Sequence, residues 1–188
     1  MKNLLSTKLN EHIEVFQSIK ELESLIYESA TLISNSFKSG GKVIFCGNGG
    51  SASDCQHIAA EFVGKFHKER VSLPAISLTS DSSVMTAIAN DYGFENIFSR
   101  QIQGLANEND ILFCISTSGN SKNITNALKE AKNQSLKSIL LTSIKVKNAK
   151  GIANLEIKVN SETTARIQES HIFIGHSICE LVELLALN

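Results

Sequence analysis

The stretch Val43-Ile44-Phe45-Cys46-Gly47-Asn48-Gly49-Gly50-Ser51 decides the fold of this chain. Its first four residues form a short apolar run, which is typical of a strand buried on both faces of a sheet. The glycines that follow let the backbone turn sharply, and residues 51–66 then carry apolar side chains at helical spacing. A buried strand, a glycine turn and a helix predict one unit of a parallel α/β sheet.

The same alternation continues along the chain. Short apolar runs recur at 75–78, 111–115, 138–141 and 155–159, and helical stretches lie at 84–90 and 121–133. Because parallel strands joined through helices form right-handed crossovers, this order predicts helices on both faces of the sheet. We therefore expect a three-layer αβα sandwich with a five-stranded parallel sheet of the flavodoxin-like, doubly wound type.

Helical segments flank this α/β core. Residues 1–40 have apolar positions at helical spacing and no proline, which predicts one or two helices that end at Gly40. A final helix is expected over residues 164–187. We predict a single domain over residues 1–188, with a helical N-terminal segment (1–40), an α/β core (41–160) and a C-terminal helical segment (161–188).

Composition excludes several classes of protein. Lys plus Arg (18) nearly balances Asp plus Glu (19), so no polyanion-binding surface is indicated and nucleic acid is not an expected partner. The chain has no apolar run of about eighteen residues and no apolar leader, which predicts a cytoplasmic protein without a membrane partner. The four cysteines lack C-x-x-C spacing, so buried reduced thiols are expected rather than disulfides or a thiolate metal site.

Two loops have the composition of anion-binding sites. Gly47-Asn48-Gly49-Gly50-Ser51 and Ser116-Thr117-Ser118-Gly119-Asn120-Ser121 each follow a predicted strand and precede a predicted helix. Helix N-termini, flexible glycines and hydroxyl donors can hold a phosphate without Lys or Arg. Either loop alone fits an ordinary strand-to-helix turn equally well, but their joint presence favours a phosphate ligand. Neither loop matches a dinucleotide fingerprint or a P-loop.

Two predicted helices carry groups suited to acid–base or metal chemistry. His57 and Glu61 are four residues apart on the polar edge of one helix, where a surface ion pair is the simpler interpretation. On the last helix, His171 lies beside the apolar stripe and is interpreted as a packed structural residue. His176 lies nearly opposite that stripe and can share a site with Gln168. His57, Glu61, Gln168 and His176 fit a divalent-metal set and a proton-transfer set equally, but spacing alone cannot bring residue 57 next to residue 176.

Several longer motifs resemble those of a known family. They are Gly47 through Glu61, Ala89-Asn90-Asp91-Tyr92-Gly93-Phe94, Ile115 through Ser121, and Arg166-Ile167-Gln168-Glu169 with His176. Together they closely resemble the phosphoheptose isomerases, enzymes of the sugar isomerase (SIS) fold. The similarity spans almost the whole chain in the expected order, which makes it far more specific than a single glycine loop.

The resemblance implies conversion of sedoheptulose 7-phosphate to D-glycero-D-manno-heptose 7-phosphate through an enediol, the first step towards nucleotide-activated heptose for lipopolysaccharide or capsule. It also implies a homotetramer with active sites at subunit interfaces and one Zn²⁺ per subunit. Two alternatives stay open: a non-catalytic SIS tetramer that binds the replication initiator protein, and an isomerase of another sugar phosphate such as arabinose 5-phosphate. Retention of the His57, Glu61, Gln168 and His176 set disfavours the binding protein.

Site residues follow from the resemblance, motif by motif. Glu61 would be the general base and His176 its acid–base partner. Zinc would be held by His57, Glu61, Gln168 and His176. Substrate contacts would come from Asn48, Gly49, Gly50, Ser51, Lys65, Asn90, Asp91, Ser116, Thr117, Ser118, Ser121 and Gln168. One departure concerns Lys65, where many relatives have arginine; lysine keeps the charge but loses the bidentate fork.

Overall fold

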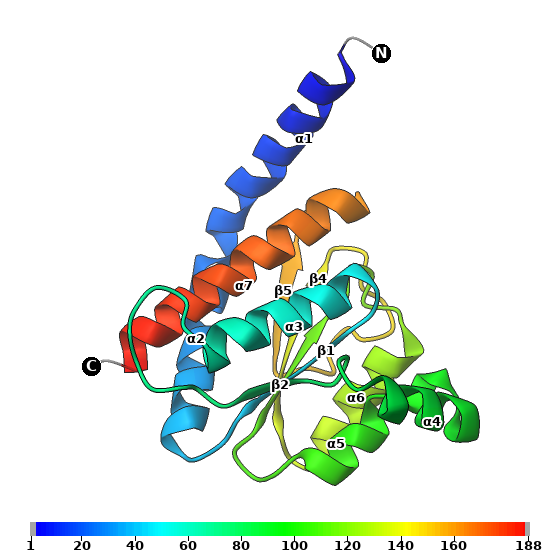
Figure 1. Ribbon diagram of the computed structural model, residues 1–188. Coiled ribbons are helices and arrows are strands. Elements are labelled where there is room, and N and C mark those ends of the chain that lie inside the picture. The colour runs from blue at the N-terminus through cyan, green and yellow to red at the C-terminus, as the bar shows by residue number, and fades with distance from the viewer. Residues whose placement is uncertain (1–2, 187–188) are drawn as a thin grey trace.

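The chain folds around a five-stranded parallel sheet (Figure 1), seen in a computed structural model that describes residues 3–186. The strands are β1 (Val43–Gly47), β2 (Ala75–Ser77), β3 (Ile111–Ile115), β4 (Lys137–Ser143) and β5 (Leu155–Val159). Their spatial order is β2-β1-β3-β4-β5, and every pair is parallel. This order is the flavodoxin-like one, so the predicted fold class is confirmed.

Helices cover both faces of the sheet and complete three layers (Figure 1). One face carries α2 (Glu23–Lys38), α3 (Gly50–Val63) and α7 (Thr164–Ala186), and the other carries α4 (Ser82–Tyr92), α5 (Ser99–Leu105) and α6 (Lys122–Asn133). Alternate strand residues point to opposite faces, so Phe45 and Phe113 join the core beneath α3, whereas Ile44 and Leu112 join the core beneath α6. The central strands are therefore buried on both faces, as predicted.

The N-terminal helix α1 (Leu4–Ser18) extends beyond the sheet and continues through a 3₁₀ turn, η1 (Ile19–Leu22), into α2. None of the residues of α1 is buried. It contacts α7 through polar and aromatic groups: His12 Nδ1 lies 2.7 Å from Glu169 Oε2, Arg166 donates to the Lys8 carbonyl at 3.0 Å, and the rings of Phe16 and Phe173 are 5.2 Å apart. Between residues 3 and 186, no helix combines the length and hydrophobicity needed to cross a bilayer.

Two details differ from the sequence predictions, and one lies outside the described residues. The helix expected over 51–66 ends at Val63, because the backbone leaves the helical path at Gly64. A 3₁₀ turn, η2 (Phe94–Asn96), and the seven-residue α5 were not predicted, since so short an amphipathic segment gives a weak periodic signal. The last helix is described as far as Ala186, so residue 187 of the predicted range lies outside the described residues.

Candidate active site

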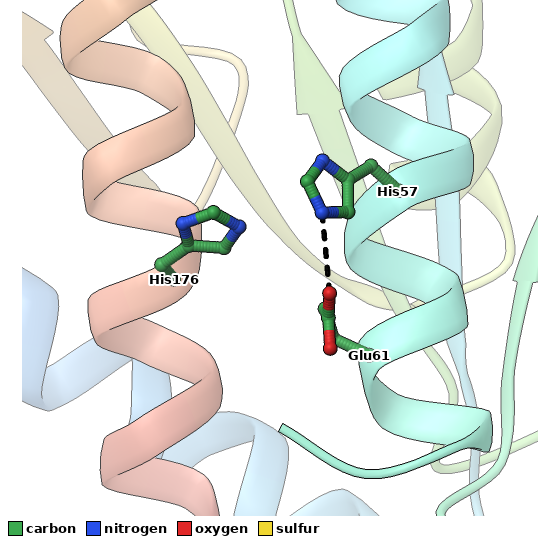
Figure 2. A group of neighbouring side chains, drawn as sticks. All are labelled: His57, Glu61 and His176. Carbon is green, nitrogen blue, oxygen red and sulfur yellow. Dashed lines mark hydrogen bonds and ion pairs between the residues drawn. The ribbon is translucent and has the colours of Figure 1, made fainter. Parts of the chain in front are cut away.

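Helices α3 and α7 bring together three side chains from distant parts of the chain (Figure 2). His57 and Glu61 project from α3, and His176 projects towards them from α7. The two imidazole centroids are 5.0 Å apart, and His57 Nε2 lies 3.1 Å from Glu61 Oε1. One nitrogen or oxygen from each of the three residues lies within 4.8 Å of the others. The convergence that spacing alone could not establish is thus present within one chain.

Two glycines permit this close approach of α3 and α7. A Cβ at Gly175, next to His176, would collide with the side chain of Ile58 on α3. A Cβ at Gly50 would likewise collide with the amide of Gln168. These contacts occur in the same order along both helices, so α3 and α7 run parallel. The sequence analysis gave Gly175 no role, although a glycine inside a long apolar helix is a recognised sign of close packing.

The environment of His176 favours its neutral form. Burial lowers the pKa of this imidazole, the neighbouring His57 and His67 rings lower it further, and Glu61 opposes the shift. Its Nε2 is buried and, among the residues that the structure describes, finds no hydrogen-bond partner. Buried polar atoms are normally paired, so this nitrogen suits a proton, a substrate oxygen or a metal ion.

The cluster also fits the zinc expectation. Two imidazoles and a carboxylate are donors that Zn²⁺ prefers, and the unpaired, neutral His176 ring is the form that can coordinate. The fourth predicted ligand, Gln168, is on α7 about two turns before His176. Its side-chain amide lies against Gly50 of α3.

The two predicted anion loops are joined by a pair of amides. Asn48 and Asn123 each donate to the side-chain oxygen of the other at 2.9 Å. A pocket of about 380 Å³ opens beside this pair, lined by Asn48, Phe94, Glu95, Ser121, Lys122 and Asn123. Asn123 was missed by the sequence analysis, because an asparagine in the first turn of a helix carries no distinctive signal without its partner.

The hydroxyl loop is held in shape by its own short-range bonds. Ser116 Oγ accepts from the Gly119 amide at 3.1 Å, and Ser118 Oγ accepts from the Asn120 amide at 3.2 Å. Gly119 adopts a φ of +61°, and a Cβ there would come within 2.9 Å of Thr142 Oγ1. Since both serine oxygens act as acceptors within the loop, their hydroxyl protons can be donated to an anion.

Two of the predicted substrate contacts, Asn90 and Asp91, lie away from this cluster. Lys65 is exposed and forms an ion pair with Glu69. Asn90 and Asp91 are exposed on α4, across the sheet from α3 and α7 (Figure 1), where Asn90 Nδ2 donates to Asp91 Oδ1 at 2.8 Å. A single chain therefore does not bring Asn90 and Asp91 to His176.

His171 is a structural residue, as its position beside the apolar stripe predicted. The ring is fully buried, and its Nε2 lies 3.1 Å from the Thr142 carbonyl. Burial lowers its pKa to about 4, although the bond to Thr142 opposes the shift. His171 thereby links α7 to the end of β4. The next residue of β4, Ser143, supports the hydroxyl loop, because its Oγ donates to the Thr117 carbonyl at 2.7 Å.

Known proteins resemble this chain in sequence and in architecture. Residues 9–143 match the family described as SIS domain. A phosphoheptose isomerase from a Nitratiruptor species is 47% identical, over 95% of this chain and 96% of its own length. The solved phosphoheptose isomerases of Neisseria gonorrhoeae and Francisella tularensis are both 36% identical and superpose with TM-scores of 0.90 and 0.92. Those alignments cover 97% and 96% of this chain, and 98% and 96% of the solved chains.

Proposed function

The chain belongs to the SIS domain family, among its phosphoheptose isomerases, and from this premise we propose how its residues perform the reaction. It is an aldose–ketose isomerase that converts sedoheptulose 7-phosphate to D-glycero-D-manno-heptose 7-phosphate. We assign the catalytic residues from one observation: the side chains of Glu61 on α3 and His176 on α7 lie close together. The initiator-binding and arabinose-phosphate alternatives are not favoured, because relatives that are 47% and 44% identical over almost the whole chain are named phosphoheptose isomerases.

Glu61 acts as the general base. Isomerisation through an enediol removes a proton from the carbon beside the carbonyl and returns it to the neighbouring carbon, which suits one carboxylate that serves both carbons. Glu61 Oε1 is paired with His57, and we assign the second oxygen, Oε2, to the substrate proton. The side chain is 24% exposed, so a ligand can reach it.

His176 moves the proton that passes between the two substrate oxygens. Its neutral ring can accept that proton at one oxygen and return it at the other near pH 7. The orphaned Nε2 is the atom that we assign to this exchange. Gln168 would orient the sugar from the same helix through its amide.

The hydroxyl loop holds the phosphate. Ser116, Thr117, Ser118 and Ser121 would donate hydroxyl protons to the phosphoryl oxygens, and the N-terminus of α6 adds a partial positive charge. Asn48, Gly49, Gly50 and Ser51 would contact the sugar, and the Asn48–Asn123 amide pair keeps the two loops in register.

One Zn²⁺ per subunit would be held by His57, Glu61, Gln168 and His176, with Glu61 and His176 coordinating through atoms other than those assigned to proton transfer. When bound, zinc would polarise the substrate carbonyl and stabilise the enediolate charge. Metal analysis of freshly purified protein tests this part of the proposal, with about one zinc per chain expected. Alanine at His57 should lower that content, whereas alanine at the exposed His67 should leave it unchanged.

The active protein is a homotetramer in the cytoplasm with sites between subunits. Association is supported by the exposed apolar side chains of Leu5 and Leu9 on α1, which are 81% and 54% exposed. A site completed by a second subunit would also bring Lys65, Asn90 and Asp91 of that subunit to the substrate. The four free, buried cysteines suit a reducing compartment. Light scattering after size-exclusion chromatography measures the oligomeric state, and a monomer would remove this part of the proposal.

A direct assay tests the reaction itself. Purified protein is incubated with sedoheptulose 7-phosphate, and aldoheptose phosphate is followed by NMR. We expect product with the wild type and about a hundredfold less with Glu61→Gln, the scale on which an acid–base group contributes. Arabinose 5-phosphate serves as the competing substrate, and turnover of that sugar alone would overturn the assignment.

A further inference from the structure

A buried ion pair joins the parts of the molecule that carry Glu61 and His176. Arg70 Nε donates to Glu183 Oε1 at 3.0 Å, and the two side chains are only 3% and 1% exposed. Arg70 lies in the segment that follows α3, and Glu183 lies on α7, two turns after His176. The pair thus connects the end of one catalytic helix to the other.

The Arg70 guanidinium also caps the end of α3. Nη2 donates to the carbonyl of Glu61 itself, at 2.8 Å, and Nη1 donates to the carbonyl of Phe62 at 2.8 Å. The last carbonyls of a helix lack partners within the helix, so the guanidinium fixes the backbone that carries the general base.

Glu183 holds the segment that packs against His176. Its carboxylate accepts from three successive backbone amides, those of Phe66, His67 and Lys68, at 2.9, 3.0 and 3.1 Å. The Phe66 ring, fixed in this way, lies 5.2 Å from the His176 ring between centroids. Burial alone raises the pKa of Glu183, but the three amides and Arg70 outweigh it and hold that pKa below its ordinary value.

We propose that Arg70 and Glu183 are positioning residues for the isomerisation, which together set the separation between the Glu61 carboxylate and the His176 imidazole. Arg70 fixes the backbone of Glu61, while Glu183 fixes Phe66 against His176. The inference rests on the proposed function, since it concerns the same acid–base pair. A misplacement of about 1 Å in such a pair can cost roughly a hundredfold in rate.

The test uses the full-length protein carrying Glu183→Gln. A glutamine has one acceptor oxygen in place of two, so it cannot hold the three amides and Arg70 together. We expect kcat to fall about tenfold to a hundredfold while KM changes by less than about threefold, because the phosphate loops are untouched. Incorporation of solvent deuterium into the sugar should slow by the same factor, since proton abstraction is the impaired step.

Asp110→Asn is the matched control. Asp110 is also a buried carboxylate, which accepts from the Lys42 ammonium at 2.5 Å and from the amides of Lys42 and Asn107 at 2.8 Å, but it lies at the amino end of β3, away from the site. Its loss should lower Tm as much as Glu183→Gln does while kcat stays within about twofold of wild type. Both variants are assayed at a temperature where they are folded. The inference is overturned if Glu183→Gln and Asp110→Asn lower Tm equally and neither changes kcat.

Arg70→Lys covers the case in which Glu183→Gln does not fold. Lysine keeps the charge beside Glu183 but cannot also reach the carbonyls of Glu61 and Phe62. We expect about a tenfold loss of kcat, and wild-type turnover in this variant would contradict the proposal. An inactive wild type would instead refute the proposed function, so the two failures are distinguishable.

Discussion

The hydroxyl loop and the acid–base cluster are built in opposite ways. The loop consists of consecutive residues, Ser116 to Ser121, and internal bonds such as that from the Gly119 amide to Ser116 Oγ hold its shape. The cluster joins Glu61 to His176 from distant parts of the chain, where α3 and α7 pack closely and Gly175 faces Ile58. The proposed phosphate site is therefore largely local, with support from Ser143, whereas the proposed proton-transfer pair depends on tertiary packing. Variants of the loops should change KM, and variants of the cluster should change kcat.

The largest effect on turnover is expected at the cluster itself. Glu61→Gln removes the proton acceptor but preserves the shape of the side chain, so kcat should fall at least about a hundredfold while KM stays close to that of wild type. NMR of the product gives the rate, and circular dichroism with size-exclusion chromatography checks that the variant is folded and assembled. Near-normal turnover would remove Glu61 from the mechanism.

His171 links the two regions, and its burial predicts a pH-dependent stability. Its pKa is lowered to about 4 in the folded protein, against about 6.5 when unfolded. As the pH falls below about 6.5, the unfolded chain takes up a proton that the folded chain resists, so stability decreases and levels off near pH 4. The free energy of unfolding should therefore be about 2 kcal/mol lower at pH 5 than at pH 7.5 because of this residue.

Urea unfolding at a fixed protein concentration measures this difference. His171→Gln keeps a donor for the Thr142 carbonyl but does not titrate, so its unfolding free energy should depend less on pH over the same range. An unchanged pH dependence in the variant would show that other groups are responsible.

A smaller effect, confined to binding, is expected where the two anion loops meet. Asn123→Ala leaves the Asn48 amide without its partner, which should raise KM about tenfold with little change in kcat. Asn126→Ala is the control, because Asn126 lies on the same helix and its amide donates to the Glu95 carbonyl rather than to Asn48. If kcat falls while KM stays constant in the Asn123 variant, the loops are not independent of the cluster.

The smallest effect tests the helix contact that assembles the cluster. Gly175→Ala introduces a Cβ that meets Ile58, so we expect the free energy of unfolding to fall by about 1–3 kcal/mol, the usual cost of overpacking, with a several-fold loss of kcat. Ile58→Val removes the Cδ1 atom in conflict and should restore part of the rate in the double variant. A double variant no faster than Gly175→Ala would show that this contact does not set the position of His176.

The sequence predicted elements with a strong local signal and missed those without one. Continuous apolar runs such as 111–115 identified the buried strands, and the helical stripe separated the packed His171 from His176. The seven-residue α5 escaped because it is too short for periodicity to show. Arg70 and Glu183 were missed because neither residue is unusual until the pair is seen buried and joined.

The sequence by itself determined the parallel α/β architecture, the two loops and the chemical types available at the site, since these depend on residues close together along the chain. The tertiary structure alone decided that the ion pair between His57 and Glu61, expected from their spacing, also forms a site with His176. The physical reason is that the distance between residues 61 and 176 depends on how α3 and α7 pack, including the close contact of Gly175 with Ile58, and no spacing along the chain encodes that packing.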